Sequence, residues 1–220
     1  MSVIDISEGR ISGWSAAIRG MRNSRQSWEQ SDSKEDGLYF IMGENDLKLA
    51  SSLAKKGGSH AKFRRMIHVS MDISAPIYWW KEFDTYKIGT ATNSTSTMYS
   101  ITDKKFTSHD FAIDDNMSLM FCTGMISAIS RLNIMRNLYL EEEDPETKQI
   151  YWRGIIALLP ESYKQLRTVD LNYEVLARIV KERKGHKLRE WGIFINYIET
   201  LLPYAKELIF CESGKSGKKK

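Results

Sequence analysis

The chain has 220 residues, of which 42% are hydrophobic and 27% are charged, so it can bury a sizeable core as one large domain or two small ones. The formal net charge is +4, but the tail alone contributes four lysines: Lys215, Lys218, Lys219 and Lys220. Subtracting them leaves the rest of the chain near neutral, so the basic balance does not indicate a nucleic-acid surface. Residues 213–220 are predicted to form a disordered basic tail.

The two cysteines, Cys122 and Cys211, are too few for a disulfide framework and have no metal-type neighbours, so no metal site is expected. Cys122 is predicted to pack in the core, since nothing near it would activate the thiol. No apolar run reaches the roughly 18 residues of a membrane span, and the first ten residues lack a signal pattern. We therefore expect a cytoplasmic protein without a membrane or nucleic-acid partner.

The N-terminal part is predicted to contain two helices and a short strand. Residues 12–25 carry apolar side chains at helical spacing, and residues 37–42 are typical of a short buried strand. Asn45 or Asp46 would cap a second helix over 46–56.

The stretch from Met66 to Tyr99 is the most informative part of the sequence. Its first residues alternate between polar and apolar, which predicts a strand that buries Ile67, Val69, Met71 and Ile73. Pro76 then begins a helix over 77–88, and Gly89 ends it. Trp79 and Trp80 on this helix are interpreted as core residues, with a stacking platform for an aromatic ligand as the alternative.

Eight of the ten residues after Gly89 are Thr, Ser, Asn or Ala. A flexible segment of this composition can bind a phosphate-bearing ligand through backbone N–H groups and hydroxyls. The alternative is an ordinary linker.

The C-terminal half is predicted to be mostly helical. A long apolar helix extends from about residue 116 towards Tyr139, a second covers 148–159, and a last one covers 188–208. Asp170 would cap a helix whose inward residues are Leu171, Val175, Leu176 and Ile179. We therefore expect one α+β domain over 1–212, dominated by helices and with a small sheet.

Asn172 and Arg183 are eleven positions apart, close to three helical turns, so they would share one helix face. Their side chains suit an amide-rich ring and a phosphate respectively. The alternative is a solvated, charged face. The usual dinucleotide, P-loop, zinc-protease and nucleophile-elbow motifs do not occur. Each histidine is interpreted as an ordinary polar residue: His60, His68, His109 and His186.

Together these segments resemble the flavin-dependent thymidylate synthases over most of residues 12–195. That family has a strand ending in Ala-Pro, a helix with Arg-His-Arg, a loop of the form Asn-Glu-x-Ser-x-Arg-Tyr, and a later Asn followed eleven residues on by Arg. The matching residues are Ala75-Pro76, Asn93, Ser96, Tyr99, Leu159-Pro160, Asn172 and Arg183, with Phe63 kept in an upstream segment. The family fold implies that the small sheet is mostly antiparallel.

The chain also departs from the family pattern, and the departures concern substrate contacts more than the fold. Thr85-Tyr86-Lys87 stands in place of Arg-His-Arg, and the loop is one residue longer. The family's loop Glu, loop Arg and flavin-side His are replaced by Ser94, Met98 and Arg65.

The resemblance implies an FAD enzyme, a homo-oligomer and most simply a tetramer, that converts dUMP to dTMP. A one-carbon unit would pass from methylenetetrahydrofolate to C5 of the pyrimidine deoxynucleotide, with NADPH as a further co-substrate and without a cysteine nucleophile. By the same resemblance, the nucleotide would contact Glu82, Ser94, Thr95, Ser96, Thr97, Arg153 and Arg183. FAD would contact Arg65, Thr85, Tyr86, Lys87, Asn93, Asn172 and Arg178.

Within that set, Arg183 would be catalytic, because it would pair with the anion that develops on the base. Lys87 would contact a flavin phosphate, and Tyr86 would stack or hydrogen-bond where the family has histidine. Ser94 and Met98 leave a second activity open, a deoxycytidylate (dCMP) methylase or 5-hydroxymethylase on the same scaffold. The loss of Arg-His-Arg leaves open a non-catalytic homologue that binds flavin or nucleotide, and an unrelated α+β binding protein remains a further alternative.

Overall fold

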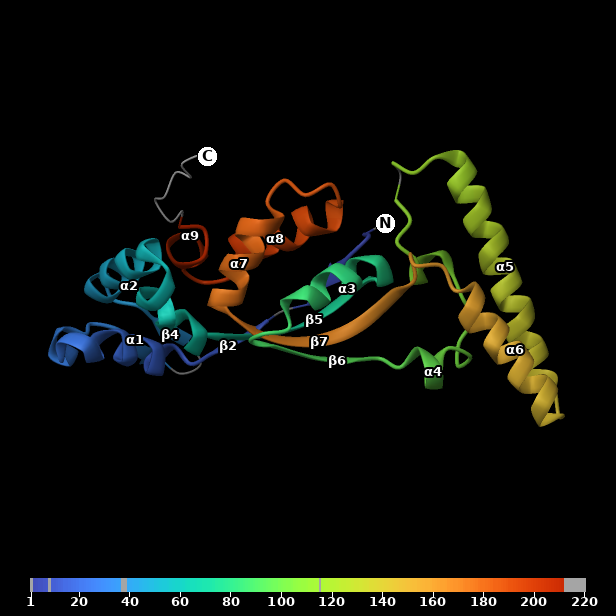
Figure 1. Cartoon of the computed structure of the whole chain (residues 1–220), viewed down its shortest axis with the longest axis horizontal. Coiled ribbons are helices and arrows are strands. Elements are labelled where there is room, and N and C mark those ends of the chain that lie inside the picture. Colours follow the sequence, from blue (N-terminus) through green and yellow to red (C-terminus); the bar gives the residue numbers. More distant parts are fainter. Residues whose placement is uncertain (1, 8, 37–38, 115, 212–220) are drawn as a thin grey trace, which may run out of the picture. The chain divides into compact units, whose positions relative to one another are not determined.

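The computed structural model describes residues 2–7, 9–36, 39–114 and 116–211, and Figure 1 shows their course. They divide into two compact units, each built from three segments of the sequence. Unit 1 comprises the described residues of 1–7, 72–85 and 93–168, and unit 2 those of 8–71, 86–92 and 169–220. The predicted tail over 213–220 lies outside the described residues, and the single domain over 1–212 stays a prediction.

The strands are β1 (Asp5–Ile6), β2 (Arg10–Ser12), β3 (Lys34–Asp36), β4 (Tyr39–Ile41), β5 (His68–Pro76), β6 (Thr90–Ser94) and β7 (Lys164–Asn172). The α-helices are α1 (Trp14–Arg22), α2 (Glu44–Lys56), α3 (Ile77–Phe83), α4 (Thr97–Ser100), α5 (Leu119–Glu141), α6 (Pro145–Leu158), α7 (Tyr173–Arg183), α8 (Arg189–Leu201) and α9 (Ala205–Leu208). Short 3₁₀ segments include η3 (Gly58–Met66) and η4 (Asp84–Tyr86). The predicted class, a helix-dominated α+β fold with a small antiparallel sheet, is confirmed.

The main sheet has the strand order β1-β5-β7-β6, and β2 also pairs with β5. β1 and β2 both run antiparallel to β5, with Ile6 opposite Ile73 and Ile11 opposite Val69. The predicted alternation along β5 is confirmed, because its apolar side chains are buried while the polar residues between them are exposed or partly exposed. In unit 1 the Thr168 hydroxyl donates to Asp72 at 2.6 Å.

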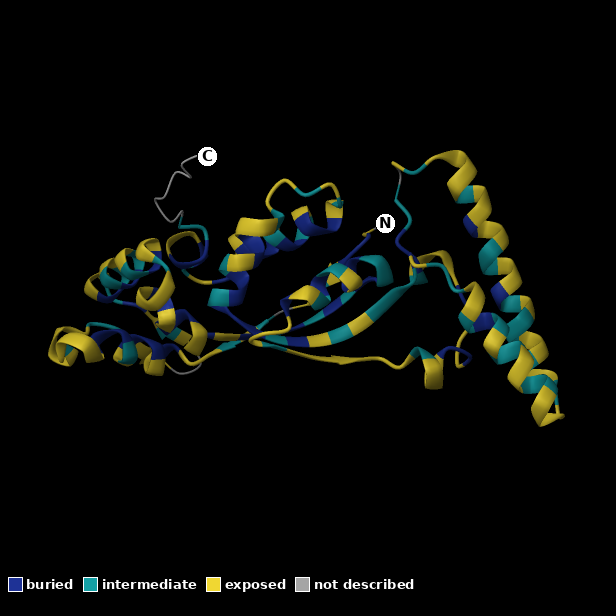
Figure 2. Cartoon of the chain, in the orientation of Figure 1, coloured by how far each residue is buried: buried dark blue, intermediate teal, exposed yellow. Residues whose placement is uncertain are grey.

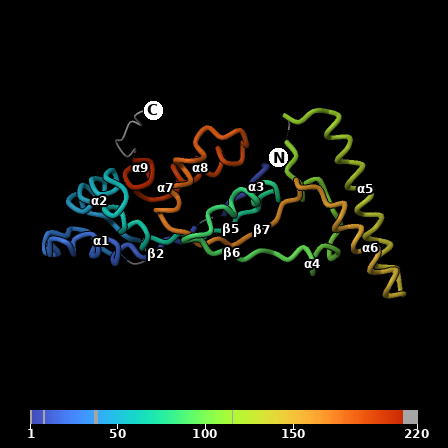
Figure 3. The backbone as a smooth tube through the Cα atoms, viewed as in Figure 1, coloured from blue at the N-terminus to red at the C-terminus, as the bar shows by residue number. Residues whose placement is uncertain are grey.

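Unit 1 contains a helical hairpin formed by α5 and α6, which lie side by side in Figures 1 and 3. Ser118 and Asp144 cap the two helices with their side-chain oxygens. Leu132 of α5 packs with Phe106 and Phe111 in a small apolar cluster. Trp79, Trp80 and Phe83 of α3 are fully or almost fully buried, so the core interpretation of the tryptophan pair is confirmed.

Unit 2 packs α1, α2, η3, α7, α8 and α9 around an aromatic core. The Trp14 ring lies 5.5 Å from Phe40 in a stacked arrangement and meets the edges of Tyr173 and Tyr204. Val175, Leu176 and Ile179 of α7 are buried as predicted, and so is Leu171, which lies in β7. Figure 2 shows buried residues along α7. Within the described residues, none of the helices combines the length and the apolar character that crossing a bilayer requires.

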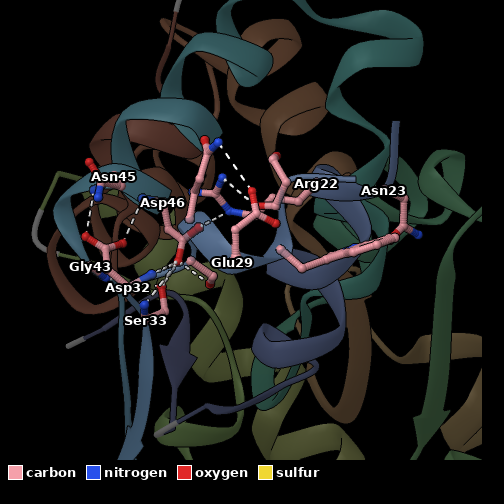
Figure 4. A network of polar contacts seen from close by, with 12 residues as sticks. Arg22, Asn23, Glu29, Asp32, Ser33, Gly43, Asn45 and Asp46 are labelled. Carbon is pink, nitrogen blue, oxygen red and sulfur yellow. Dashed lines mark hydrogen bonds and ion pairs between the residues drawn. The ribbon is translucent and has the colours of Figure 1, made fainter. Parts of the chain in front are cut away.

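A buried carboxylate, Asp46, joins α2 to α1 and to the segment before β3 (Figure 4). Arg22 Nε donates to it at 2.7 Å, and the hydroxyls of Ser31 and Ser33 donate at 2.7 and 2.6 Å. The backbone N–H groups of Asp32 and Ser33 add two further bonds at 3.1 and 3.0 Å. The prediction that Asn45 or Asp46 caps α2 is therefore wrong, because the helix begins at Glu44 and both residues lie within it. Asp32 accepts from the backbone N–H groups of Asn45 and Asp46 instead.

Several further sequence-based expectations are wrong. Residues 90–94 form β6 instead of a flexible loop, and residues 164–172 form β7, which was not predicted. Asp170 therefore lies in a strand, and Asn172 caps α7 instead. The last predicted helix is divided into α8 and α9, and β4 is largely exposed where a buried strand was expected. Residues 37–38 of that expectation lie outside the described part of the chain.

Candidate functional site

The end of α7 carries a cluster of cationic and aromatic side chains, all within unit 2. Arg183 Nε donates to the Tyr86 hydroxyl at 2.9 Å. The Arg183 guanidinium lies 4.9 Å from the Trp191 ring centroid and 5.6 Å from that of Tyr86. Arg178, five residues earlier on α7, lies 4.9 Å from the Tyr86 centroid. The structure thus brings together three of the predicted site residues: Tyr86, Arg178 and Arg183.

The Tyr86 phenol, only 1% exposed, is held in its neutral form. Burial raises its pKa most strongly, the Arg183 hydrogen bond lowers it, and a hydrogen bond to Glu182 raises it, with a net increase above the ordinary value. The phenol therefore accepts from Arg183 and donates to the Glu182 carboxylate. Glu182 also faces Arg178 at 3.8 Å, so the polar contacts connect both arginines through one tyrosine.

A tight turn at Gly89 lies against the start of α7 and leaves polar groups available to a ligand. Gly89 has a φ of +80°, and a Cβ there would lie 3.1 Å from both Asn172 Nδ2 and Val175 Cγ2. Asn172 Oδ1 accepts from the first N–H groups of α7, and among the described residues its Nδ2 has no hydrogen-bond partner. The Thr90 hydroxyl is buried and likewise has no partner within the described chain. A ligand with polar edges would satisfy both groups.

Two other predicted cofactor residues, Lys87 and Arg65, also belong to unit 2 and are exposed. Lys87 is exposed, and its carbonyl accepts from Thr90 N at 3.3 Å. Arg65 is exposed at the end of η3, whereas its neighbour Arg64 is buried and pairs with Glu174 at 2.6 Å. Neither Lys87 nor Arg65 has an ion-pair partner among the described residues.

The remaining predicted residues belong to unit 1, and the structure does not bring them together in the same way. Glu82 lies on α3, Thr85 donates to the Glu82 carbonyl at 2.8 Å, and Arg153 is exposed on α6. Asn93 and Ser94 are exposed at the end of β6.

The segment that follows β6 has a structural role of its own. Thr95 N donates to the Leu166 carbonyl at 2.9 Å, and Gln165 donates back to the Thr95 carbonyl at 2.8 Å. Ser96 caps α4, which begins at Thr97. These bonds hold the segment on β7 instead of leaving it as a free loop.

Two residues of the Arg183 cluster were not predicted, namely His186 and Trp191. His186 Nε2 lies 3.3 Å from Arg183 Nη1, and Trp191 is fully buried beneath the guanidinium. In the sequence His186 has no metal-type or catalytic neighbour, and Trp191 belongs to an ordinary amphipathic helix, so only their tertiary position reveals them. Within the described chain, no group of three or more His, Cys, Asp or Glu side chains is arranged to hold a metal ion.

Replacing Gly89 with alanine should destabilise the fold at this turn. The added methyl group would meet Asn172 and Val175, and a non-glycine residue at positive φ costs about 1–2 kcal/mol. We expect a lower melting temperature, measured by differential scanning calorimetry. Gly20→Ala is the matched control, because there the nearest atom is the flexible Met66 sulfur at 3.3 Å. Equal melting temperatures of the two variants would contradict this role of Gly89.

No protein-family model and no curated protein matches this chain. Solved structures do match it. A flavin-dependent thymidylate synthase ThyX from Helicobacter pylori, complexed with FAD and dUMP, has a TM-score of 0.71 and 16% identity over 96% of this chain and 100% of that chain. A second structure of ThyX from the same organism, also with FAD and dUMP, has a TM-score of 0.68 and 16% identity over 94% of this chain and 96% of that one. The chain therefore has the fold of the flavin-dependent thymidylate synthases, as the sequence resemblance predicted.

Proposed function

We propose that the protein is an FAD-dependent enzyme that transfers a one-carbon unit from methylenetetrahydrofolate to C5 of a pyrimidine deoxynucleotide, in the first instance dUMP. The observation that carries the proposal is the Arg183 cluster at the end of α7. A half-buried guanidinium, fixed by a phenol and an indole, is suited to stabilise negative charge that develops on a pyrimidine ring. The fold, shared with proteins solved in complex with FAD and dUMP, supports this assignment.

The turn at Gly89 fits the flavin. The unpartnered Thr90 hydroxyl and Asn172 amide are groups that a heteroaromatic ring with carbonyl and ring nitrogens can satisfy. Lys87 and Arg178 supply positive charge for its phosphates. Bound flavin, once reduced by NADPH, would supply the hydride, whereas the residues of this chain would bind and orient the base and the cofactor.

One incubation tests the proposal. The purified protein, reconstituted with FAD, is mixed with methylenetetrahydrofolate, NADPH and either dUMP or dCMP. The mass of the product nucleotide is then measured by mass spectrometry. We expect dUMP to gain the mass of a methyl substituent. A protein that binds FAD but leaves both nucleotides unchanged would be a non-catalytic homologue, and the proposal would be wrong.

A second substrate is favoured by Ser94 and Met98, the residues that stand where the related family has Glu and Arg. Their side chains are exposed at the end of β6 and in α4. Uracil presents a carbonyl acceptor at C4 where cytosine presents an amino donor. A gain of mass on dCMP alone would identify a deoxycytidylate methylase, and a larger gain that corresponds to a hydroxymethyl group would identify a hydroxymethylase.

We also propose that the protein is a homo-oligomer in which α5 contacts a second copy of the chain. α5 is rich in apolar residues, and three of them, Leu119, Met120 and Ile126, are 80%, 83% and 69% exposed. Apolar side chains on a helix are normally buried against another part of the protein or against a partner. Figure 2 shows that exposed residues recur along the helix.

Replacing Met120 and Ile126 with glutamate should dissociate the oligomer, because the charges would have to be buried in the interface. Light scattering after gel filtration should show a smaller species, and activity should be lost with it. Glutamate at Ser127, an exposed polar position of α5, is the control. A monomeric wild type would rule out the oligomer.

A further inference from the structure

Two polar groups at the turn before β6 determine which kind of ligand edge this turn can bind. Thr90 begins β6, and Asn172 ends β7, the neighbouring strand of the sheet. Both residues belong to unit 2. The Thr90 hydroxyl is buried and has no hydrogen-bond partner among the described residues. Buried polar groups are normally hydrogen-bonded, so a bound ligand is a natural partner for this hydroxyl.

The direction of hydrogen bonding at Asn172 is fixed by the helix that this residue caps. Asn172 is only 7% exposed, and its Oδ1 accepts from the backbone N–H groups of Glu174 and Val175, each at 3.1 Å. A side-chain amide carries its acceptor on oxygen and its donors on nitrogen, so Nδ2 can only donate. Within the described chain Nδ2 has no acceptor. A ligand atom that binds Nδ2 must therefore be an acceptor.

Gly89 is next to both groups and keeps the approach to them open. A Cβ at this position would lie 3.1 Å from Asn172 Nδ2, which is tighter than ordinary van der Waals contact. The absence of a side chain therefore leaves Nδ2 accessible from the turn. Thr90 follows directly, and consecutive Cα atoms are about 3.8 Å apart. The hydroxyl and the amide are thus close enough to contact neighbouring atoms of one ring.

From these contacts we infer that Thr90 and Asn172 recognise a ring carbonyl that is adjacent to a ring N–H. Asn172 Nδ2 donates to the carbonyl oxygen, and the Thr90 hydroxyl accepts from the N–H. Oxidised flavin and uracil both carry this edge, and a methyl group on N3 abolishes it. The inference rests on the proposed function, which brings both rings to this protein. It adds the residues that select them.

The first test compares Thr90→Val with wild type in the binding of FAD and of 3-methyl-FAD, which lacks the N–H. We expect the dissociation constant for FAD, measured by flavin fluorescence, to rise about tenfold, while that for 3-methyl-FAD stays the same. The hydroxyl has no partner within the described chain, so the melting temperature without ligand should be unchanged or higher. A purely structural role of Thr90 would lower the melting temperature instead.

Asn172→Asp tests the donor without removing the helix cap. Aspartate caps helices about as well as asparagine, and its charge is favourable at a helix N-terminus. The carboxylate has no donor, so the dissociation constant for FAD should rise about tenfold or more in a protein that remains folded. Thr92→Val, at an exposed position of β6, is the matched control and should change no dissociation constant.

The same measurements with dUMP and 3-methyl-dUMP identify the ring that is bound. A loss confined to FAD assigns the turn to flavin, and a loss confined to dUMP assigns it to uracil. Unchanged dissociation constants for both ligands in Thr90→Val and Asn172→Asp would overturn the inference. Equal losses for a ligand and its 3-methyl analogue would also overturn it. Binding is measured here without turnover, so an inactive protein that shows the expected losses would contradict the proposed function alone.

Discussion

Replacing Arg183 with alanine is expected to lower kcat strongly while the protein remains folded. The variant removes the half-buried guanidinium that lies between Tyr86 and Trp191. Loss of a single group that stabilises transition-state charge lowers kcat by about 100- to 1,000-fold. We expect a decrease of that size in kcat for dUMP, measured with saturating FAD and co-substrates. Full activity of the variant would show that Arg183 has no part in the reaction.

The Tyr86 phenol should contribute to this effect only through Arg183. Tyr86→Phe keeps the ring that faces both arginines but removes the acceptor 2.9 Å from Arg183 Nε. We expect a roughly tenfold decrease in kcat/KM, which is the size of one charged hydrogen bond. In the Arg183→Ala background the same substitution should have no further effect, because coupled residues are not additive.

The matched control is Tyr204→Phe, which removes a phenol that accepts from Met42 N at 2.8 Å in the same unit. Its effect should be equal in both backgrounds. If Tyr86→Phe also lowers activity equally with and without Arg183, the tyrosine acts independently, for example by contacting the flavin itself.

The parts of the fold that the sequence predicted are those with a strong local period. β5 alternates regularly, and its apolar residues are buried as expected. The inward residues of α7 follow from their 3.6-residue spacing and are also buried. In both cases one face of a single element determines the structure, so neighbouring residues in the sequence are sufficient to recognise it.

β6 and β7 could not be recognised in this way. Along β7 only the second half is well buried, and the apolar residues Leu166 and Val169 are three positions apart, which breaks the period of two. β6 has the composition of a loop and becomes a strand by pairing with β7. The bond from Thr95 N to the Leu166 carbonyl holds the next residue on β7 as well. Pairing with distant residues decides these strands, not local preference.

The sequence likewise predicted only part of the candidate site. The spacing of Asn172 and Arg183 places both on one helix, which Asn172 also caps. The bond between Arg183 and Tyr86 joins residues 97 positions apart, and the contact with Trp191 depends on how α8 folds back on α7. The sequence therefore predicted the chemical groups of the site, while their mutual contacts required the tertiary structure.

The largest loss of stability is expected from Asp46→Asn. The carboxylate is fully buried, accepts five hydrogen bonds and neutralises the buried Arg22. Removing one partner of a buried ion pair costs about 3–5 kcal/mol, because the other charge stays buried without compensation. Urea denaturation should show this decrease in the free energy of unfolding. Asp32→Asn, which alters only the cap of α2, should cost about 1 kcal/mol.

The difference in the free energy of unfolding between wild type and Asp46→Asn should also depend on pH. Burial alone would raise the pKa of Asp46, but hydrogen bonds from Ser33, Ser31 and Arg22 outweigh it and lower the pKa below its usual value. A carboxyl whose pKa is lower in the folded than in the unfolded state stabilises the fold fully above the unfolded value, about 3.9. This contribution is lost as the pH falls through the folded pKa. The two proteins should therefore differ most at neutral pH and converge in acid. A difference that stays constant from pH 7 to well below 4 would show that the ionised carboxylate is not the stabilising group.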